Sequence, residues 1–248
     1  MSTFALPPVG SANGTALQAY LLGAVEFGAA LALQRQLAYH VSGDREQAAL
    51  ILCEHPPAIT VGRDGSRAHI LYEPEELRSL RWPLRWVNRG GGCLLHLPGQ
   101  MAIYPILALD RFGLGLGDYL DRLRQVIIDV LDDFSVPAVP GSDPSGVWVG
   151  ARPVAHLGVA VRDWVSYYGA AFNVYPDLEP LRRVRTGPGA PPMTSLERER
   201  RGPLRAALVR ERLLEHFAAR FGFGRLSLFF HHPTLGARAG SGTVTSRP

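Results

Sequence analysis

The sequence contains no lysine and only two cysteines, Cys53 and Cys93, among its 248 residues. All 26 positions counted as Lys or Arg are therefore arginine, a bias that a genome rich in G and C produces. Without lysine, the chain has no side-chain amine to form a Schiff base, act as a general base or hold a phosphate. Two cysteines are too few for a disulfide-rich scaffold or a four-cysteine zinc site, and reduced thiols in a cytoplasm are the simplest interpretation.

Long apolar runs and cofactor motifs are also missing. The most apolar stretch, residues 21–33, contains Glu26 and is shorter than a membrane span. The N-terminus lacks the basic region of a signal peptide. No Walker loop, zinc spacing, dinucleotide fingerprint or hydrolytic triad occurs, so no metal and no cofactor are expected. The net charge is +4, but the arginines are spread along the chain rather than clustered with aromatic residues. We therefore expect a cytoplasmic protein that binds neither nucleic acid nor membrane.

Hydrophobic residues make up 46% of the chain and charged residues 19%, the balance of an ordinary globular protein. A single domain spanning 1–248 is predicted, with a core at about 16–221 between a loose N-terminal arm and a C-terminal tail. Apolar periodicity predicts helices over 16–40, 118–134 and 203–221. Short apolar runs predict strands over 48–53, 59–62, 84–87, 101–109, 147–149, 154–162 and 165–174. This mixture indicates an α+β fold, an α/β sandwich in which helices flank a mixed or antiparallel sheet.

The glycine-rich segment 89–92 is the sharpest local feature. Three successive glycines let a backbone approach a ligand closely and expose its N–H groups. The adjacent arginine can pair with a carboxylate or a phosphate. The segment runs into a predicted strand, and the candidate substrate-binding residues here are Arg89, Gly90, Gly91, Gly92, Cys93, Leu94, Leu95 and His96. A glycine-rich hairpin turn is the alternative interpretation of the same string.

Two neighbouring predicted strands later in the chain each carry a glycine, Gly158 and Gly169. This pattern is typical of backbone that passes close to a ligand, although a pair of bulges gives it too. The candidate substrate-binding residues here are His156, Leu157, Gly158, Gly169, Ala170 and Ala171. Farther along, Thr194 or Ser195 is expected to cap a short helix.

Several segments in one order resemble the lipoyl (octanoyl) transferases of the biotin and lipoate protein ligase superfamily. Each segment alone is a weak signal, whereas the ordered set is specific and runs from about residue 16 to 220. The matching segments are Glu54-His55-Pro56-Pro57, Arg89-Gly90-Gly91, His96 with Pro98-Gly99-Gln100, Tyr104-Pro105-Ile106-Leu107, Gly146-Val147-Trp148-Val149, Leu157-Gly158-Val159, Gly169 with Asn173-Val174, and Thr194-Ser195-Leu196.

The resemblance implies a fold and a reaction. The fold is the catalytic domain of biotin and lipoate ligases. The reaction moves a medium-chain acyl group, octanoyl, from acyl carrier protein to a lysine of a lipoyl domain. In the family it passes through a thioester on an enzyme cysteine, and a nearby lysine lowers the pKa of that thiol. The thiolate is the nucleophile, and a neighbouring cation stabilises it.

The sequence departs from the family pattern at both catalytic positions. The family's cysteine lies eight residues before the threonine of Thr-Ser-Leu, a count that ends on Thr186. The family's lysine lies five residues before the glycine of Leu-Gly-Val, which places Pro153 there. At one further position, just before the glycine of the second strand, the family has a histidine and this chain has Tyr168. A threonine hydroxyl is far less acidic than a thiol and needs a dedicated base. These substitutions predict a degenerate, non-catalytic or chemically rewired homologue that keeps the acyl pocket.

Three functions are compatible with these departures. The first is a pseudoenzyme that binds an octanoyl or lipoyl group without covalent attachment. The second is an active acyltransferase that uses Cys93 as a relocated nucleophile, although a small buried hydrophobe is the simpler interpretation of that residue. The third is direct transfer from the carrier thioester to the target lysine, with the fold only aligning the two. An ATP-dependent ligase is disfavoured, because related ligases use a lysine at the adenylate.

Overall fold

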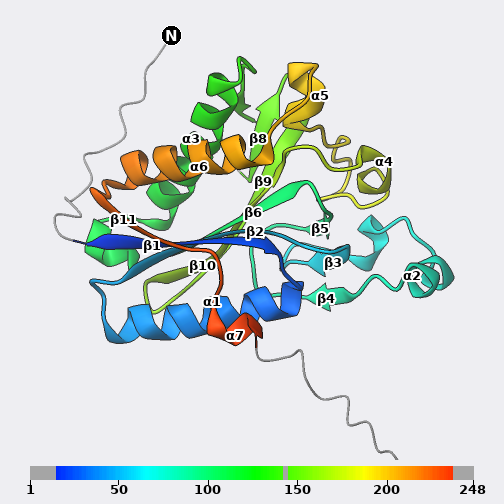
Figure 1. Ribbon diagram of the computed structural model, residues 1–248. Helices are drawn as coiled ribbons and strands as arrows, with labels where there is room; N and C mark the ends of the chain where they lie inside the picture. The colour runs from blue at the N-terminus through cyan, green and yellow to red at the C-terminus, as the bar shows by residue number, and fades with distance from the viewer. Residues whose placement is uncertain (1–14, 142–144, 237–248) are drawn as a thin grey trace, which may run out of the picture.

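The computed structural model describes residues 15–141 and 145–236, which form two sheets and the helices around them (Figure 1). The larger sheet has eight strands in the order β11 (Arg225–Phe229), β1 (Ala16–Ala24), β2 (Ala48–Glu54), β6 (Gln100–Ile106), β10 (Val165–Asn173), β9 (Arg152–Arg162), β8 (Gly146–Val149) and β7 (Val139–Pro140). The smaller sheet has the order β4 (Leu84–Trp86), β3 (Ala58–Val61) and β5 (Cys93–His96). Strand β1 pairs in parallel with β11 and β2, and the other strands of the large sheet pair antiparallel. The predicted mixed sheet is confirmed.

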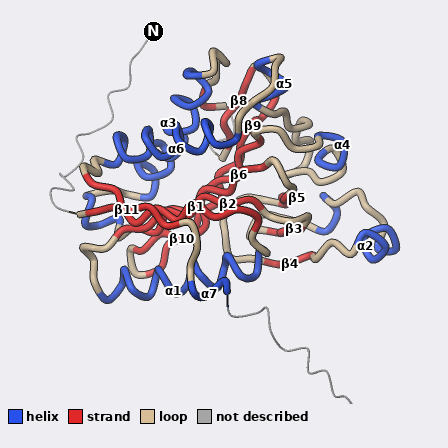
Figure 2. Tube along the Cα trace, in the orientation of Figure 1, coloured by secondary structure: helices blue, strands red, loops and turns tan. Residues whose placement is uncertain are grey.

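Helices cover both faces of the large sheet, as Figures 1 and 2 show. Helices α3 (Leu116–Asp133) and α6 (Ala206–Phe221) lie on one face, and α1 (Phe27–Gly43) lies on the other. The shorter helices are α2 (Pro74–Leu80), α4 (Leu178–Leu181), α5 (Leu196–Arg200) and α7 (Pro233–Gly236). Strand β2 supplies both cores by alternation: Leu50 and Leu52 pack with α3 and α6, whereas Ile51 and Cys53 pack with α1. The predicted sandwich of sheet and helices is therefore confirmed.

The predicted helix over 16–40 is wrong in its first third. Residues 16–24 form strand β1, and the helix begins only at Phe27. Along β1, Leu17 and Ala19 face one core while Tyr20 and Leu22 face the other. A strand that is buried on both faces shows no polar alternation, so its apolar run merges with the following helical stripe.

Strand β11 was not predicted, because all five of its residues are exposed and carry no burial pattern. It pairs in parallel with β1 and extends the sheet beyond the predicted core boundary at residue 221. Of the predicted C-terminal tail, residues 222–236 are described and contain β11 and α7 (Pro233–Gly236), whereas residues 237–248 and the predicted N-terminal arm up to residue 14 lie outside the described residues. No helix in the described ranges is long and apolar enough to cross a bilayer.

Candidate active site

The glycine-rich segment packs against strand β9, and its glycines are needed for that contact. The backbone N–H of Gly90 donates to the carbonyl of Val159 at 2.9 Å. A Cβ atom on Gly158 would lie 2.7 Å from the carbonyl oxygen of Gly90, and one on Gly169 would lie 2.0 Å from that of Ile103. The strand glycines therefore admit the protein's own backbone. Both glycines also line the inner cavity described below, so the predicted approach to a ligand stays a prediction.

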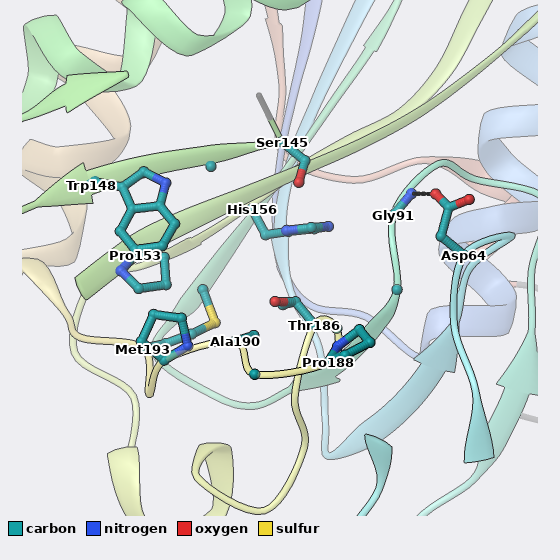
Figure 3. A pocket seen from close by; sticks show the side chains of 15 residues that line it. Asp64, Gly91, Ser145, Trp148, Pro153, His156, Thr186, Pro188, Ala190 and Met193 are labelled. Carbon is teal, nitrogen blue, oxygen red and sulfur yellow. Dashed lines mark hydrogen bonds between the residues drawn. The ribbon is translucent and has the colours of Figure 1, made fainter. Parts of the chain in front are cut away.

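An outer cavity of about 380 Å³ lies beside this segment (Figure 3). Thr186 and Pro153, the two positions that the resemblance marks as catalytic, both line it. It is also lined by Gly91 and Gly92 of the glycine-rich segment, and its other lining residues are Asp64, Ser145, Gly146, Trp148, His156, Gly187, Pro188, Gly189, Ala190, Pro191 and Met193. The structure thus brings together two positions that lie 33 residues apart in the sequence.

The loop over 185–193 forms one wall of the outer cavity and contains no helix or strand, as its prolines and glycines predict. It packs tightly on the glycine-rich segment, since a Cβ atom on Gly92 would lie 1.7 Å from the carbonyl oxygen of Thr186. After the loop, the Thr194 N–H donates to the carbonyl of Pro153 at 2.9 Å. The Ser195 hydroxyl accepts from the backbone of α5, which confirms the predicted cap.

A small inner cavity lies among residues of β5, β6, β9 and β10, and it shares the lining residue His156 with the outer cavity. It gathers much of the predicted binding set, namely Arg89, Leu94, His96, His156, Gly158, Gly169, Ala170 and Ala171. Its other lining residues are Phe27, Tyr104 and Tyr168, which sequence reasoning did not place in the site. The free space is only about 10 Å³, roughly the room of a single water molecule.

The other predicted residues lie elsewhere. Successive side chains of a strand point to opposite faces, so Cys93 and Leu95 of β5 point away from Leu94 and His96. They pack in the hydrophobic cluster of the small sheet, and Leu157 packs in the core under α3 and α6. Gly90 lines neither cavity.

Both cysteines are fully buried and lie outside the two cavities. The Cys93 Sγ donates to the carbonyl of Ser66 at 3.2 Å, and burial raises the pKa of its thiol. Burial raises the pKa of the Cys53 thiol as well, and the charge of Glu54 adds to the effect. Both thiols therefore stay protonated at neutral pH, the opposite of what a nucleophile needs.

A buried guanidinium lies at the inner cavity. Arg89 is 3% exposed, and its Nη2 donates to the hydroxyl of Thr60 at 2.8 Å and to the Thr60 carbonyl at 3.2 Å. Its Nη1 donates to the carbonyl of Gly90 at 3.0 Å. Burial lowers the pKa of Arg89 to about 10, so the group stays charged at neutral pH.

The same Thr60 hydroxyl begins a chain of hydrogen bonds that passes the inner cavity at His96. It donates to Nε2 of His96 at 3.0 Å, and Nδ1 of His96 donates to Oε1 of Gln100 at 3.1 Å. The Gln100 amide donates to Asn173 at 2.8 Å, and Asn173 donates to the carbonyl of Thr194 at 3.0 Å. Burial, with the nearby His55 and Arg89, lowers the pKa of His96 well below its usual value. This chain ties the inner cavity to the end of the loop that carries Thr186.

A second buried imidazole supports the inner cavity from the side of α1. The Nδ1 of His55 donates to the carbonyl of Val25 at 2.6 Å, and its Nε2 accepts from the Tyr104 hydroxyl at 2.8 Å. Burial lowers the pKa of His55 to about 4, so it is neutral at pH 7. Within 15–141 and 145–236, no group of three or more His, Cys, Asp or Glu residues is arranged to hold a metal ion.

Comparison with known proteins assigns the family. Residues 27–218 match the model of the lipoyl protein ligase A/B catalytic domain. The octanoyltransferase of Geotalea uraniireducens is 36% identical over 197 residues, covering 79% of this chain and 89% of the relative. That of Stutzerimonas stutzeri is 35% identical over 208 residues, covering 82% and 90%. A bi-partite lipoate protein ligase from Thermoplasma acidophilum has the same fold, with a TM-score of 0.64, 14% identity and coverage of 89% of each chain. The chain belongs to the lipoyl protein ligase A/B catalytic domain family.

Proposed function

We propose that this protein is a cytoplasmic acyltransferase that moves octanoyl from acyl carrier protein directly to a lysine of a lipoyl domain. No acyl group rests on a cysteine of the chain during the transfer. The octanoyltransferase relatives support the choice of acyl group and of partners. The observation that carries the direct route is the position of Cys53 and Cys93, both buried and outside the two cavities.

The outer cavity supplies neither a thiol nor an amine at the positions that matter in the family. The Thr186 side chain offers an alcohol, which needs a base before it can attack a thioester. The Pro153 side chain has no polar atom, and its carbonyl accepts the N–H of Thr194. Because the chain has no lysine, no other residue can replace the missing amine. A covalent thioester on the chain therefore has no support from this geometry.

Direct transfer needs only that the two substrates meet in the right place. The inner cavity would hold the acyl chain, and the outer cavity would receive the carrier arm and the incoming lysine. The amine nitrogen attacks the thioester carbonyl, a C–N bond forms, the C–S bond breaks and the carrier leaves as its free thiol. Alignment of two reactants can be worth about 7–11 kcal/mol of the barrier.

A non-catalytic acyl-binding protein is the second candidate. This candidate is favoured by Thr186 and Pro153, which carry neither the thiol nor the amine of the family's reaction. The inner cavity nevertheless keeps Arg89, His96 and the small residues of β9 and β10. Such a pseudoenzyme would bind octanoyl-acyl carrier protein and release it unchanged. It differs from the first candidate in one product, the octanoylated lipoyl domain.

The test is intact-mass spectrometry of a mixture of this protein, octanoyl-acyl carrier protein and an unmodified lipoyl domain. We expect the mass of one octanoyl group on the lipoyl domain, formed faster than without the protein. A family octanoyltransferase in a parallel mixture shows that the substrates are competent. If that control works and the lipoyl domain stays unmodified here, the transfer proposal is wrong and the non-catalytic candidate replaces it.

A further inference from the structure

We propose that His156 is the general base of the transfer, taking the proton that the attacking lysine amine loses. The inference rests on the proposed function and adds a residue to it. His156 stands at neither the cysteine position nor the lysine position of the family.

His156 is the residue that the two cavities share among the residues described. It projects from β9 and lines both the outer and the inner cavity. Its partners on the neighbouring strands are the small residues Gly146 on β8 and Ala171 on β10. If the acyl chain occupies the inner cavity and the carrier arm the outer one, the thioester carbonyl lies between them. That position is beside the imidazole.

The surrounding backbone is shaped to admit this ring. A Cβ atom on Gly91 would lie only 2.4 Å from Nε2 of His156, so the glycine is required for the imidazole to reach this position. Gly91 also has a φ of +76°, a conformation that side chains with a Cβ rarely adopt. Figure 3 shows the ring between Ser145 and Thr186, pointing toward Gly91. The ring is 4% exposed, so bulk water has little access to it.

Other candidate bases are less suited by their position. His96 lines only the inner cavity, and Asp64 lines only the outer one. His55 lines neither cavity. His156 is the imidazole that the outer cavity presents among the residues that the structure describes.

A single imidazole is enough to balance the protons of the transfer step, because it accepts one proton and later returns it. The lysine amine enters as its free base, having left one proton in solvent. Its nitrogen attacks the carbonyl carbon while His156 accepts a proton from that nitrogen. The tetrahedral intermediate then collapses, the C–S bond breaks, and the imidazolium returns the proton to the departing sulfur. The products are an amide on the lipoyl domain and a free carrier thiol, and His156 is neutral again.

The experiment measures the initial rate of octanoyl transfer to the lipoyl domain by His156→Ala and His156→Gln. Glutamine keeps much of the volume but cannot accept a proton. Because a positioned base contributes about 100- to 10,000-fold, we expect both variants to be slower by at least about 100-fold. Binding of octanoyl-acyl carrier protein is expected to stay within about threefold. His40→Ala, an exposed histidine on α1, is the matched control and should keep the wild-type rate.

The transfer rate of His156→Ala with added imidazole distinguishes a general base from a residue with only a structural role, because free imidazole can replace a base but not a packing contact. We expect imidazole to restore part of the rate of His156→Ala, and substituted imidazoles of higher pKa to restore more of it. Thermal denaturation of both variants controls for folding. Wild-type transfer with unchanged rates in folded His156→Ala and His156→Gln would overturn the role of His156 and leave the proposed function standing. Acyl ester on Thr186 would also overturn direct attack with His156 as its base. An inactive wild type would contradict both proposals.

Discussion

The two cavities of the site are built in different ways. The inner cavity is lined mainly by strand residues. It is supported by the buried chain of hydrogen bonds that runs from Arg89 through Thr60, His96 and Gln100 to Asn173. The outer cavity is walled by the loop over 185–193, by the glycine-rich segment and by residues of β8 and of β9, among them the buried Pro153. Strand positions are held by the core and change only at a cost in stability, whereas loop positions can change more freely. The inner cavity would then be retained by the fold, while the loop position Thr186 would be freer to vary.

The largest effect expected from this contrast is a loss of stability in mild acid, which arises at the inner cavity. Burial lowers the pKa of His55 from 6.5 to about 4, so between these values the unfolded chain binds the proton and the folded chain does not. Stability is therefore full above about pH 6.5 and falls toward pH 4, by about 3 kcal/mol for this one group.

The measurement is urea denaturation at a series of pH values for the wild type and His55→Gln. His96 contributes in the same direction and remains in both proteins, so the difference between the two curves reports His55 together with its effect on the pKa of His96. We expect the variant to lose a slope of about 1.4 kcal/mol per pH unit within this window. Parallel curves would show that burial does not hold His55 neutral.

Alanine at one glycine of each cavity should separate stability from activity. Gly169→Ala places a Cβ atom 2.0 Å from the carbonyl of Ile103 in the middle of the sheet, where neither strand can withdraw. We expect it to lose about 1–3 kcal/mol of unfolding free energy. Gly92→Ala meets the carbonyl of Thr186 at 1.7 Å, but the loop can move. We expect a smaller loss of stability and a larger loss of transfer. Gly117→Ala on α3, with nothing within 4 Å, controls for the substitution itself.

The hydroxyl of Thr60 should contribute measurably to the stability of the inner cavity. Thr60→Val keeps the shape of the side chain but removes the hydroxyl between Arg89 and His96, which leaves Nε2 of His96 without that partner and Nη2 of Arg89 with the Thr60 carbonyl alone. We expect a loss of about 1–3 kcal/mol in denaturant unfolding. Thr60→Ser, which retains the hydroxyl, should recover most of it. Equal losses in the two variants would assign the effect to packing of the methyl group instead.

The smallest expected effect is that of Cys93→Ala. The thiol packs inside the small sheet and contacts neither cavity, so its removal should cost about 1 kcal/mol of stability and leave the transfer rate within twofold of the wild type. Transfer rates and melting temperatures measured side by side check both halves. A loss of transfer in a folded Cys93→Ala protein would restore the relocated nucleophile as an explanation.

The glycine and histidine residues were the most informative part of the sequence for predicting the site. The segment 89–92 pointed to residues of both cavities, with Arg89 at the inner one and Gly91 and Gly92 at the outer one. The glycines of β9 and β10 pointed to the inner cavity, because close backbone contacts demand glycine. Reading residues 93–96 as one continuous set was less successful, since a strand turns every second side chain away. Cys93 and Leu95 therefore lie in another cluster.

The residues that sequence reasoning missed are placed at the site by tertiary packing and belong to no motif recognisable in the sequence. Phe27 begins the helix whose start was predicted too early, so its place at the inner cavity could not be inferred. Tyr168 has a φ of +56° inside β10, a backbone irregularity that propensity does not foresee. Whether Thr186 faces a cavity likewise depends on a loop held by the contact of Gly92 with its carbonyl.

The claim that matters most is that transfer needs no cysteine of this chain. The measurement is a time course of intact masses for a Cys53→Ala/Cys93→Ala protein mixed with octanoyl-acyl carrier protein and a lipoyl domain, beside the wild type. We expect both proteins to octanoylate the lipoyl domain at similar rates and neither to carry an acyl group at any time. An octanoyl adduct on the wild-type chain that forms and decays as product appears, and is missing from the variant along with its activity, would contradict direct transfer.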